Sequence, residues 1–521
     1  MSIDLGDFAG WKRLQQDQPR LAILSLLNYL VSRVAISSRE VWRATLTTTK
    51  IPIATKLAYG FGAIAYGVKN NGFDFFLLLF YSQILGVEAE LVGLALLTAL
   101  VFDAFSDPFV GYLSDNTRSR WGRRHPWMYF AATPVAIAYF FLWSPPEGIS
   151  GNMLFAYLVV LSILIRTLIT LYEVPSSALA AELTRDYDER TSLMAWRTFF
   201  GWIGGTLIAV FTLAVILAPN EGNPSGLFNR DGFTTYGLIA SAMIFVSIMV
   251  ASLGTHRLIP TLPAAPAKQA KKLGSIFAEI LETLTSKSFF ALFMATILSS
   301  IATGLAMSLN LYINSYFWGF TQEQISILIL ASLVGASLAV VIAPFFTKQF
   351  GKRNGALIAA CATLFTSPVL ITLRLLGVLE PMPVDGQSFL LPLIFIVAVI
   401  EMTLIISFQV LMYSMITDLV EESEVKTKRR SEGVFFAAIT FSAKATQGLG
   451  IFAASLVLAF VNFPEGAEPG QVADSTVQEL GMTYLIAIVG LWILRLLCVR
   501  LYKIDRTAHE RNVAQTLTPA D

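Results

Sequence analysis

The chain has 521 residues, of which 55% are hydrophobic and only 14% are charged, and its mean hydropathy is +0.64. Soluble domains carry about 25% charged residues, so this composition excludes an ordinary soluble domain. The formal net charge of +1 provides no general basic field for nucleic acid, and we expect no nucleic-acid partner.

Long apolar runs dominate the chain from residue 56 onward. Residues 1–55 hold only the short stretch LAILSLLNYLV, which we interpret as an interfacial helix or part of a disordered cytoplasmic extension. Each later run is long enough to cross a bilayer, and backbone pairing in hydrocarbon requires such spans to be helices. The sequence predicts an all-α membrane protein with twelve spans, at 58–86, 89–113, 127–145, 152–182, 193–218, 232–254, 289–318, 322–347, 354–377, 388–419, 432–462 and 477–502.

The connections between these spans differ in charge. Those after even-numbered spans are rich in Lys and Arg, as in DNTRSRWGRRH and TKQFGKRNG, whereas those after odd-numbered spans are almost free of them. Positive loops mark the cytoplasmic side, so we predict that both termini are cytoplasmic. A long connection, 255–288, separates a six-helix bundle at 56–254 from a second at 289–504, and 505–521 form a tail. Two halves of this kind are typical of transporters, which bind substrate between them near mid-membrane.

The second span carries two acidic residues, Asp103 and Asp107, four positions apart and therefore on one helix face. Ionised carboxylates this close in a low dielectric repel each other, and a bound cation or a shared proton relieves the repulsion. We predict a site for Na⁺, Li⁺ or H⁺ here. The alternative is that these side chains cap or pair with arginines of the adjoining loop.

Later spans contain further intramembrane polar groups. Glu173 lies mid-span beside Pro175, Thr170 offers another oxygen one turn earlier, and Arg197 follows in the fifth span. Glu173 and Arg197 either form an ion pair or bind substrate. Lys444 in the eleventh span requires a carboxylate partner, and a lysine that exchanges with a cation is itself a coupling device. Arg166, Glu401 and Gln409 receive no role.

The first span is unusually polar, with Lys69, Asn70, Asn71 and Asp74 in succession. Helical spacing places several of these on one face, which predicts that they line the cavity, although helix packing alone is the alternative. In the loop after the second span, we expect contacts between aspartate and arginine to close the cytoplasmic side of the outward-facing state. This predicted cytoplasmic gate consists of Asp115, Arg118, Arg120, Arg123 and Arg124.

Several long motifs resemble one family. They are KLAYGFGAIAYG, DAFSDPFVGYLSDNTRSRWGRRHPW, YEVPSSALAAELTRDYDERTSL and ITDLVEESEVKTKRRSEGVFFAAITFSAKATQGLG. Together they resemble the glycoside–pentoside–hexuronide:cation symporters of the major facilitator superfamily, the sodium:galactoside group that includes the melibiose permease. The similarity extends over about residues 56–505. It implies a twelve-helix fold and cation-coupled import.

The resemblance also implies site residues. The cation site falls on Asp103, Asp107 and Thr170, with Ser106 where the permease has Asn, and Na⁺ would be held by the two aspartates. Lys444 and Arg197 match the family's span-11 lysine and span-5 arginine. The sugar site departs from the permease, because Gly67 aligns with its span-1 Asp. The substrate-binding residues expected here are Tyr66, Asn70, Asn71, Asp74, Glu173, Ser177 and Arg197, with Tyr66 replacing a Lys, Glu173 an Asp and Ser177 a Trp.

The prediction is a secondary transporter that couples Na⁺ or H⁺ to symport of a sugar or glycoside across the inner membrane by alternating access. It needs no cofactor besides the coupling ion, and we expect a monomer in the lipid bilayer. The first alternative is a transporter of a lysophospholipid or other amphiphile on the same fold. A membrane-embedded enzyme or sensor is more remote, because the sequence has no HExxH and no Cys/His cluster.

Overall fold

The computed structural model describes residues 51–184, 187–219, 226–262, 287–382, 389–427, 444 and 446–501. All secondary structure in these ranges is helical, and eight of the helices are long and apolar enough to cross a membrane. This confirms the predicted all-α membrane fold. The N-terminal extension up to residue 50, most of the central loop, the C-terminal tail and the first part of the eleventh span lie outside the described residues.

The first half begins with a segmented helix where one polar span was predicted. It runs through α3 (Ile53–Phe61), α4 (Ile64–Asn71), η1 (Gly72–Phe76), α5 (Leu77–Leu79) and η2 (Phe80–Ile84), where η1 and η2 are π-helical. The remaining elements are α6 (Ala89–Asn116), α7 (His125–Trp143), α8 (Gly151–Leu183), α9 (Tyr187–Phe211), η3 (Thr212–Ile216), α10 (Arg230–His256) and η4 (Ile259–Thr261). π-helical turns concentrate at functional sites, and η1 follows the polar residues of α4 directly.

The second half is built in a similar way. Its elements are α12 (Lys287–Ser308), α13 (Asn310–Tyr312), η5 (Ile313–Phe317), α14 (Gln322–Leu375), α15 (Leu390–Thr427), η6 (Thr446–Gly450), α17 (Ile451–Phe460) and α18 (Asp474–Arg500). The long α14 covers two predicted spans. Gly351 breaks it with φ of 77°, a left-handed conformation that glycine adopts without strain, at the basic turn predicted between those spans. The twelve predicted spans are consistent with these elements.

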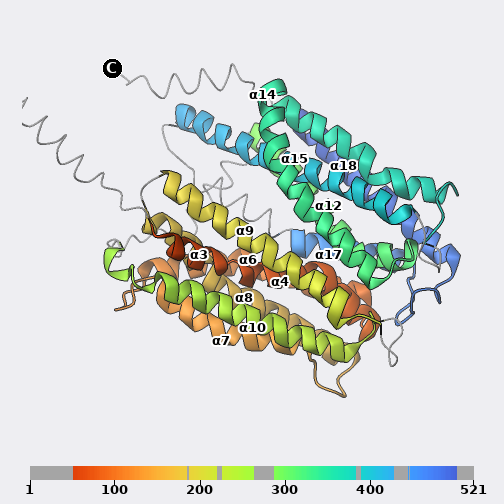
Figure 1. The fold of residues 1–521 in the computed structure, drawn as a ribbon, viewed down its shortest axis with the longest axis horizontal. Helices are drawn as coiled ribbons and strands as arrows, with labels where there is room; N and C mark the ends of the chain where they lie inside the picture. The colour runs from red at the N-terminus through yellow and green to blue at the C-terminus, as the bar shows by residue number, and fades with distance from the viewer. Residues whose placement is uncertain are drawn as a thin grey trace, which may run out of the picture.

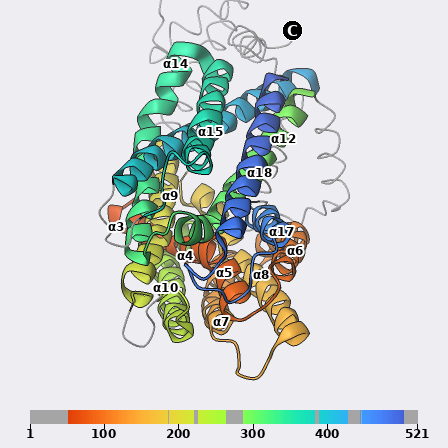
Figure 2. The same ribbon diagram turned by 90° about the vertical axis from the view of Figure 1, so that its right-hand side faces the viewer.

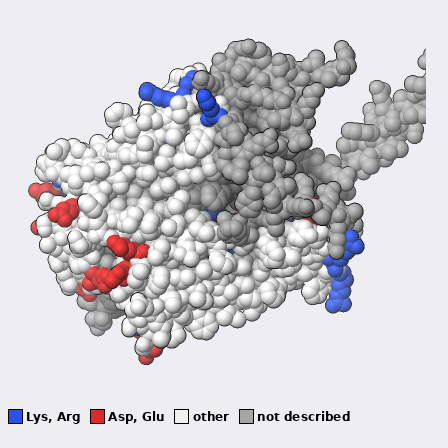
Figure 3. All heavy atoms as spheres, turned by 180° about the vertical axis from the view of Figure 1, so that it is seen from behind, with Lys and Arg blue, Asp and Glu red and all other residues white. Residues whose placement is uncertain are grey.

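The helices form two bundles side by side (Figure 1). Helices α3, α4 and α6 to α10 pack together in one bundle, and α12, α14, α15 and α18 in the other, with α17 against α6 (Figure 2). On the face shown in Figure 3, Asp and Glu gather toward the left, whereas Lys and Arg lie mainly at the top and at the lower right, with a broad uncharged surface between them. We call the end that carries the loop 117–124 the basic end. The uncharged band fits the hydrocarbon of a bilayer.

Small residues bring the two halves together along α6. A Cβ on Gly93 would lie 2.0 Å from Ser455 Oγ, and one on Gly448 would lie 2.4 Å from Leu100. Close backbone approach of this kind is how helices associate in membranes, where apolar side chains gain little from leaving lipid. One further seven-residue step along α6 from Leu100 reaches Asp107. This seam between the halves, formed by Gly93, Leu100 and Asp107 against Ser455, Gly448 and Lys444, therefore leads from small residues into the charged centre.

Candidate functional site

Asp103 is held by an arginine of the same half. The Nε and Nη2 atoms of Arg166, on α8, each lie 2.7 Å from Asp103 Oδ2. Asp103 is 4% exposed and Arg166 2% exposed, so the pair is shielded from water. The other carboxylate oxygen, Asp103 Oδ1, is buried and accepts no hydrogen bond from any described residue. The sequence left open whether Asp103 binds a cation or pairs with an arginine of the adjoining loop. In the described structure it pairs with an arginine, but this arginine belongs to a span and not to the loop.

Asp107, one turn further along α6, is held differently. Lys444 Nζ donates to Asp107 Oδ2 at 2.5 Å, and Thr170 Oγ1 donates to Asp107 Oδ1 at 3.0 Å. Lys444 belongs to the second half, so this ion pair joins the halves where the seam ends. It is also more open, because the side chains are 18% exposed for Lys444 and 23% for Asp107. The requirement for a carboxylate partner of Lys444 is met by Asp107.

Together these side chains form one charged cluster. Lys444 Nζ also lies 3.9 Å from Asp103 Oδ2, so the lysine is near both carboxylates. Lys69 on α4 is buried and interacts electrostatically with Arg166, Asp103 and Lys444. Ser106 does not enter the cluster, because its hydroxyl faces its own helix, 3.5 Å from the Asp103 carbonyl. The residues that meet are therefore Asp103, Asp107 and Thr170 from the predicted cation site, with Lys444, Arg166 and Lys69.

Sequence reasoning missed the role of Arg166. The signal was present, since Arg166, Thr170 and Glu173 follow i, i+4, i+7 spacing and share a face of α8. Thr170 was already assigned beside the aspartates, and an intramembrane arginine needs a counter-charge. That face of α8 packs against α6. A helical-wheel comparison of the two spans would have placed Arg166 beside Asp103.

A second group of polar side chains surrounds Arg197 on α9. Arg197 Nη1 donates to Ser176 Oγ at 2.8 Å and to Tyr59 Oη at 3.3 Å, and its guanidinium lies 5.5 Å from the centre of the Tyr66 ring. No carboxylate among the described residues comes within ion-pair distance of Arg197. Glu173 is close enough to interact with Arg197 and Tyr66 electrostatically, but its carboxylate forms no hydrogen bond or ion pair with the described part of the chain. The predicted alternative of a Glu173–Arg197 ion pair is not formed.

The polar residues of the first span are divided between two environments. The Asn71 amide donates to the carbonyl of Gly67 in its own helix at 3.2 Å and sits against α9. A Cβ on Gly67 would lie 2.0 Å from the Gly201 carbonyl, so no acidic side chain fits at this position. Asn70 is half-buried, and its side chain makes no hydrogen bond to the described residues. Asp74 lies in η1, half-buried, with Oδ1 shielded from water. Ser177 donates to the Glu173 carbonyl at 2.7 Å.

The predicted cytoplasmic gate is organised within one half. Arg124 forms ion pairs with Asp115 and with Glu182 of α8, the latter at 2.8 Å, and Arg123 also pairs with Glu182 at 2.8 Å. Glu182 was not predicted, although it follows Glu173 on the same helix. These contacts join α6, α8 and the loop between α6 and α7, so within the described residues they lie inside one half, and closure of the cytoplasmic side of the outward-facing state stays a prediction. The contacts brace the N-terminal half.

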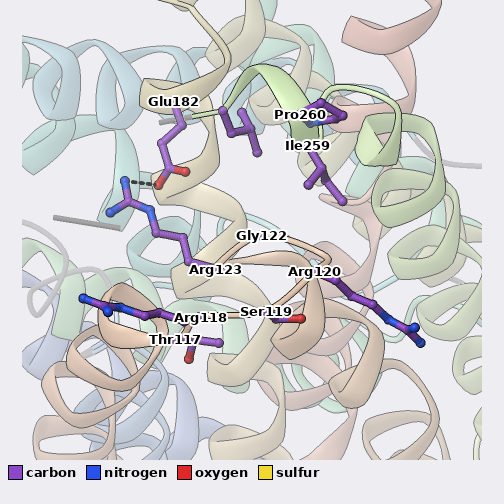
Figure 4. Close-up of a pocket in the computed structure, with 10 residues that line it drawn as sticks. Thr117, Arg118, Ser119, Arg120, Gly122, Arg123, Glu182, Ile259 and Pro260 are labelled. Atoms are coloured by element: carbon purple, nitrogen blue, oxygen red, sulfur yellow. Dashed lines mark ion pairs between the residues drawn. The ribbon is translucent and has the colours of Figure 1, made fainter. Parts of the chain in front are cut away.

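The remaining gate residues border an open cavity of 610 Å³ at the basic end. Figure 4 shows Arg123 turned toward Glu182, whereas Arg118 and Arg120 extend away in opposite directions. Ile259 and Pro260, from the turn after α10, form the other wall. Among the described residues, Arg118 and Arg120 form no ion pair. Their position fits the predicted role of loop arginines as topology determinants.

The family comparison agrees with this architecture. A model of the MFS/sugar transport protein family matches residues 58–506. The chain belongs to this family. The match confirms the predicted family and the prediction that the protein is a transporter and not an enzyme. Together with the apolar helices, it identifies a multi-pass membrane protein.

The chain is also similar to individual transport proteins. A symporter from Synechocystis is 34% identical over 42% of this chain, and the match spans 43% of the relative. The isoprimeverose transporter of Lactiplantibacillus pentosus is 25% identical over 88% of this chain and 90% of its own. The sodium-dependent lysophosphatidylcholine symporter 1 of Gallus gallus is 24% identical over 89% of each.

Solved structures share the fold. A D-xylose–proton symporter superposes with a TM-score of 0.55 at 15% identity, covering 84% of this chain and 97% of its own. A bacterial homologue of the lysosomal transporter Spinster, in an inward-facing conformation, gives 0.59 at 14% identity, over 90% and 98%. These similarities confirm the major facilitator architecture.

Proposed function

We propose that the protein is a cation-coupled symporter that carries a glycoside across the inner membrane by alternating access. The observation that carries this proposal is the ion pair between Asp107 and Lys444. It joins the two halves within their helical spans, and it is the most open of the charged contacts in the cluster. A contact that both joins the halves and binds an ion links ion binding to their relative movement.

In this mechanism, a cation arriving from outside neutralises Asp107 and competes with Lys444 for its carboxylate. Loss of the ion pair weakens the seam, and the halves then rock about the charged cluster. When the cation leaves on the cytoplasmic side, Lys444 returns to Asp107. Transport is coupled because the empty carrier and the loaded carrier each satisfy the buried carboxylates, whereas an intermediate with unpaired charges is costly.

The substrate site of this proposal is the polar group around Arg197. Arg197 is held by hydroxyl groups, while the nearby Glu173 presents a carboxylate without a hydrogen-bond partner among the described residues. Such a set of donors and acceptors suits the adjacent hydroxyls of a sugar. A galactoside held by an acidic residue at position 67 is not proposed, because α9 fills that space. Isoprimeverose, the substrate named for a relative aligned along most of its length, is the first candidate.

The test is counterflow in proteoliposomes that contain the purified protein. A panel of isoprimeverose, xylosides, galactosides and lysophosphatidylcholine is offered as the internal competing substrate, with and without Na⁺. We expect a glycoside to support counterflow, and Arg197→Gln to reduce its rate by about 10- to 100-fold, because hydrogen bonds from a charged donor contribute about 1.5–3 kcal/mol. The matched control, Arg257→Gln, removes an exposed arginine after α10 and should retain the full rate. Counterflow with no glycoside of the panel would contradict the proposal.

A second candidate is symport of a lysophospholipid. It is favoured by the alignment with the lysophosphatidylcholine symporter over 89% of both chains. Ser177 is also exposed and carries no ring for stacking a sugar. Counterflow driven by lysophosphatidylcholine but by no glycoside would support this candidate.

A further inference from the structure

The carboxylate oxygens of the two aspartates of α6 are already bonded to different protein groups. Three of their four carboxylate oxygens accept hydrogen bonds from protein groups: Asp103 Oδ2 from Arg166, Asp107 Oδ1 from Thr170 and Asp107 Oδ2 from Lys444. An alkali-metal ion is held by a shell of several oxygens and gains most where carboxylates are not already neutralised. Only Asp103 Oδ1 is without a donor among the described residues, and Arg166 is bonded to the same carboxylate.

Arg166 cannot leave this position easily. A guanidinium does not lose its proton in a protein, and two of its nitrogens engage the same oxygen. Both residues are almost fully buried, and both belong to the N-terminal half, in α6 and α8. A movement of one half against the other therefore leaves this pair intact, whereas it separates Lys444 from Asp107.

We propose that Arg166 permanently occupies the cation position at Asp103 and leaves Asp107 as the exchangeable carboxylate, so that the coupling ion is H⁺ and not Na⁺ or Li⁺. A proton needs no shell of oxygens, and one carboxylate suffices to bind it. The proton adds to Asp107 Oδ2 and displaces the ammonium group of Lys444, which keeps its own protons. One proton is carried in each transport cycle. This inference rests on the proposed symport and specifies its ion.

The groups that face Asp107 support this assignment. Among the described residues, they are Lys444 across the seam, Thr170 from α8 and Asp103 on the same helix face; Arg166 is bonded to Asp103, and Lys69 interacts with both electrostatically. Arg166 cancels the charge of Asp103. Protonation of Asp107 therefore removes the negative charge opposite Lys444, and its hydroxyl oxygen or carbonyl oxygen can still accept from Thr170.

The first experiment needs no substrate. Thermal unfolding of the purified full-length protein is followed while NaCl or LiCl replaces choline chloride at constant ionic strength. We expect no ion-specific change in Tm for the wild type. Arg166→Gly should create a saturable increase in Tm that Na⁺ or Li⁺ produces and choline does not, because a ligand that binds only the folded protein stabilises it. A saturable Na⁺- or Li⁺-specific increase in wild-type Tm would overturn the proposal, whether or not Arg166→Gly folds.

Two variants control this result. Arg166→Lys keeps a positive charge at Asp103 and should show no response to Na⁺. Arg374→Gly removes an arginine that stacks on Phe317 in the other half and should likewise gain no response. A gain of Na⁺ response in either variant would show that the effect does not arise from vacating Asp103, which contradicts the proposal.

The second experiment measures accumulation of isoprimeverose in proteoliposomes with an inward H⁺ gradient and no Na⁺. We expect accumulation in the wild type and its loss in Asp107→Asn. Accumulation driven by a Na⁺ gradient, and not by the H⁺ gradient, would overturn the assignment of H⁺ while leaving the proposed symport intact. A failure of the proposed symport is recognised separately, because it abolishes counterflow of every glycoside, whereas the unfolding experiment still decides whether Na⁺ or Li⁺ binds at Asp103.

Discussion

The two ion pairs of the second span differ in everything except the acidic residue. Asp103 pairs with Arg166 inside one half, almost sealed from water, whereas Asp107 pairs with Lys444 across the halves and remains partly exposed. A pair inside a rigid unit serves to neutralise a charge, and its energy does not change as the halves move. A pair between the two halves stabilises the arrangement of the halves in which it forms. One turn of helix therefore separates a structural pair from one able to couple ion binding to movement.

The largest expected effect follows from breaking the ion pair between Asp103 and Arg166. Arg166→Ala leaves the Asp103 carboxylate buried without its partner, which destabilises a protein by about 3–5 kcal/mol. The double variant Arg166→Ala/Asp103→Ala removes both charges and should recover most of this loss. Thermal or denaturant unfolding in detergent measures the difference. A double variant that is no more stable than Arg166→Ala would show that the two side chains do not depend on each other.

An intermediate effect is expected from breaking the ion pair between Asp107 and Lys444. Lys444→Ala removes a partly exposed ion pair, and we expect a shift of about 2 kcal/mol in the equilibrium between arrangements of the halves, between the values for exposed and buried pairs. Spin labels at Arg118 and Lys348, both exposed and on different halves, report the distance between the halves. The distance distribution should change in Lys444→Ala.

The matched control for this measurement is Lys56→Ala. Lys56 pairs with Glu189 at 2.9 Å, with side chains 12% and 15% exposed, and both residues lie in the N-terminal half. Its loss removes a similar ion pair without touching the seam. An equal change of the distance distribution in Lys56→Ala would refute the distinction between pairs within a half and pairs between halves.

The smallest effect concerns the hydroxyl that orients Asp107. Thr170→Val removes the hydrogen bond to Asp107 and should weaken ion-driven accumulation by about 2- to 10-fold, which corresponds to about 0.5–1.5 kcal/mol. Thr167→Val is the control on the same helix, because Thr167 donates only to the Ile163 carbonyl at 2.8 Å. If both variants behave alike, the contact between Thr170 and Asp107 has no part in coupling.

Much of this arrangement could be predicted from the sequence. The apolar runs gave spans close to the described helices, and the basic turn before the ninth predicted span contains the left-handed Gly351. The prediction that Lys444 needs a carboxylate, and that Asp107 and Thr170 belong to one site, agrees with the described contacts. The prediction for Lys444 worked because the cost of burying a charge in hydrocarbon depends on the residue type and its depth. The placement of Thr170 beside Asp107 came from the resemblance to the symporter family.

The identity of partners could not be predicted in the same way. Arg166 lies 63 residues from Asp103, and Lys444 lies 337 residues from Asp107. Glu182 pairs with Arg123 and Arg124, although the sequence suggested only Asp115, which pairs with Arg124 as well. The local sequence requires that each charge has a partner, but several partners satisfy this requirement equally.

The sequence by itself determined that this chain crosses the membrane repeatedly, which loops are basic and which charges enter the hydrocarbon. These properties follow from transfer free energies that each segment carries alone. Only the tertiary structure decided that Asp103 is neutralised within its own half and Asp107 from the other, and that position 67 has no room for a side chain. Those outcomes depend on which helix faces meet, and helix faces meet according to packing between segments far apart in the chain.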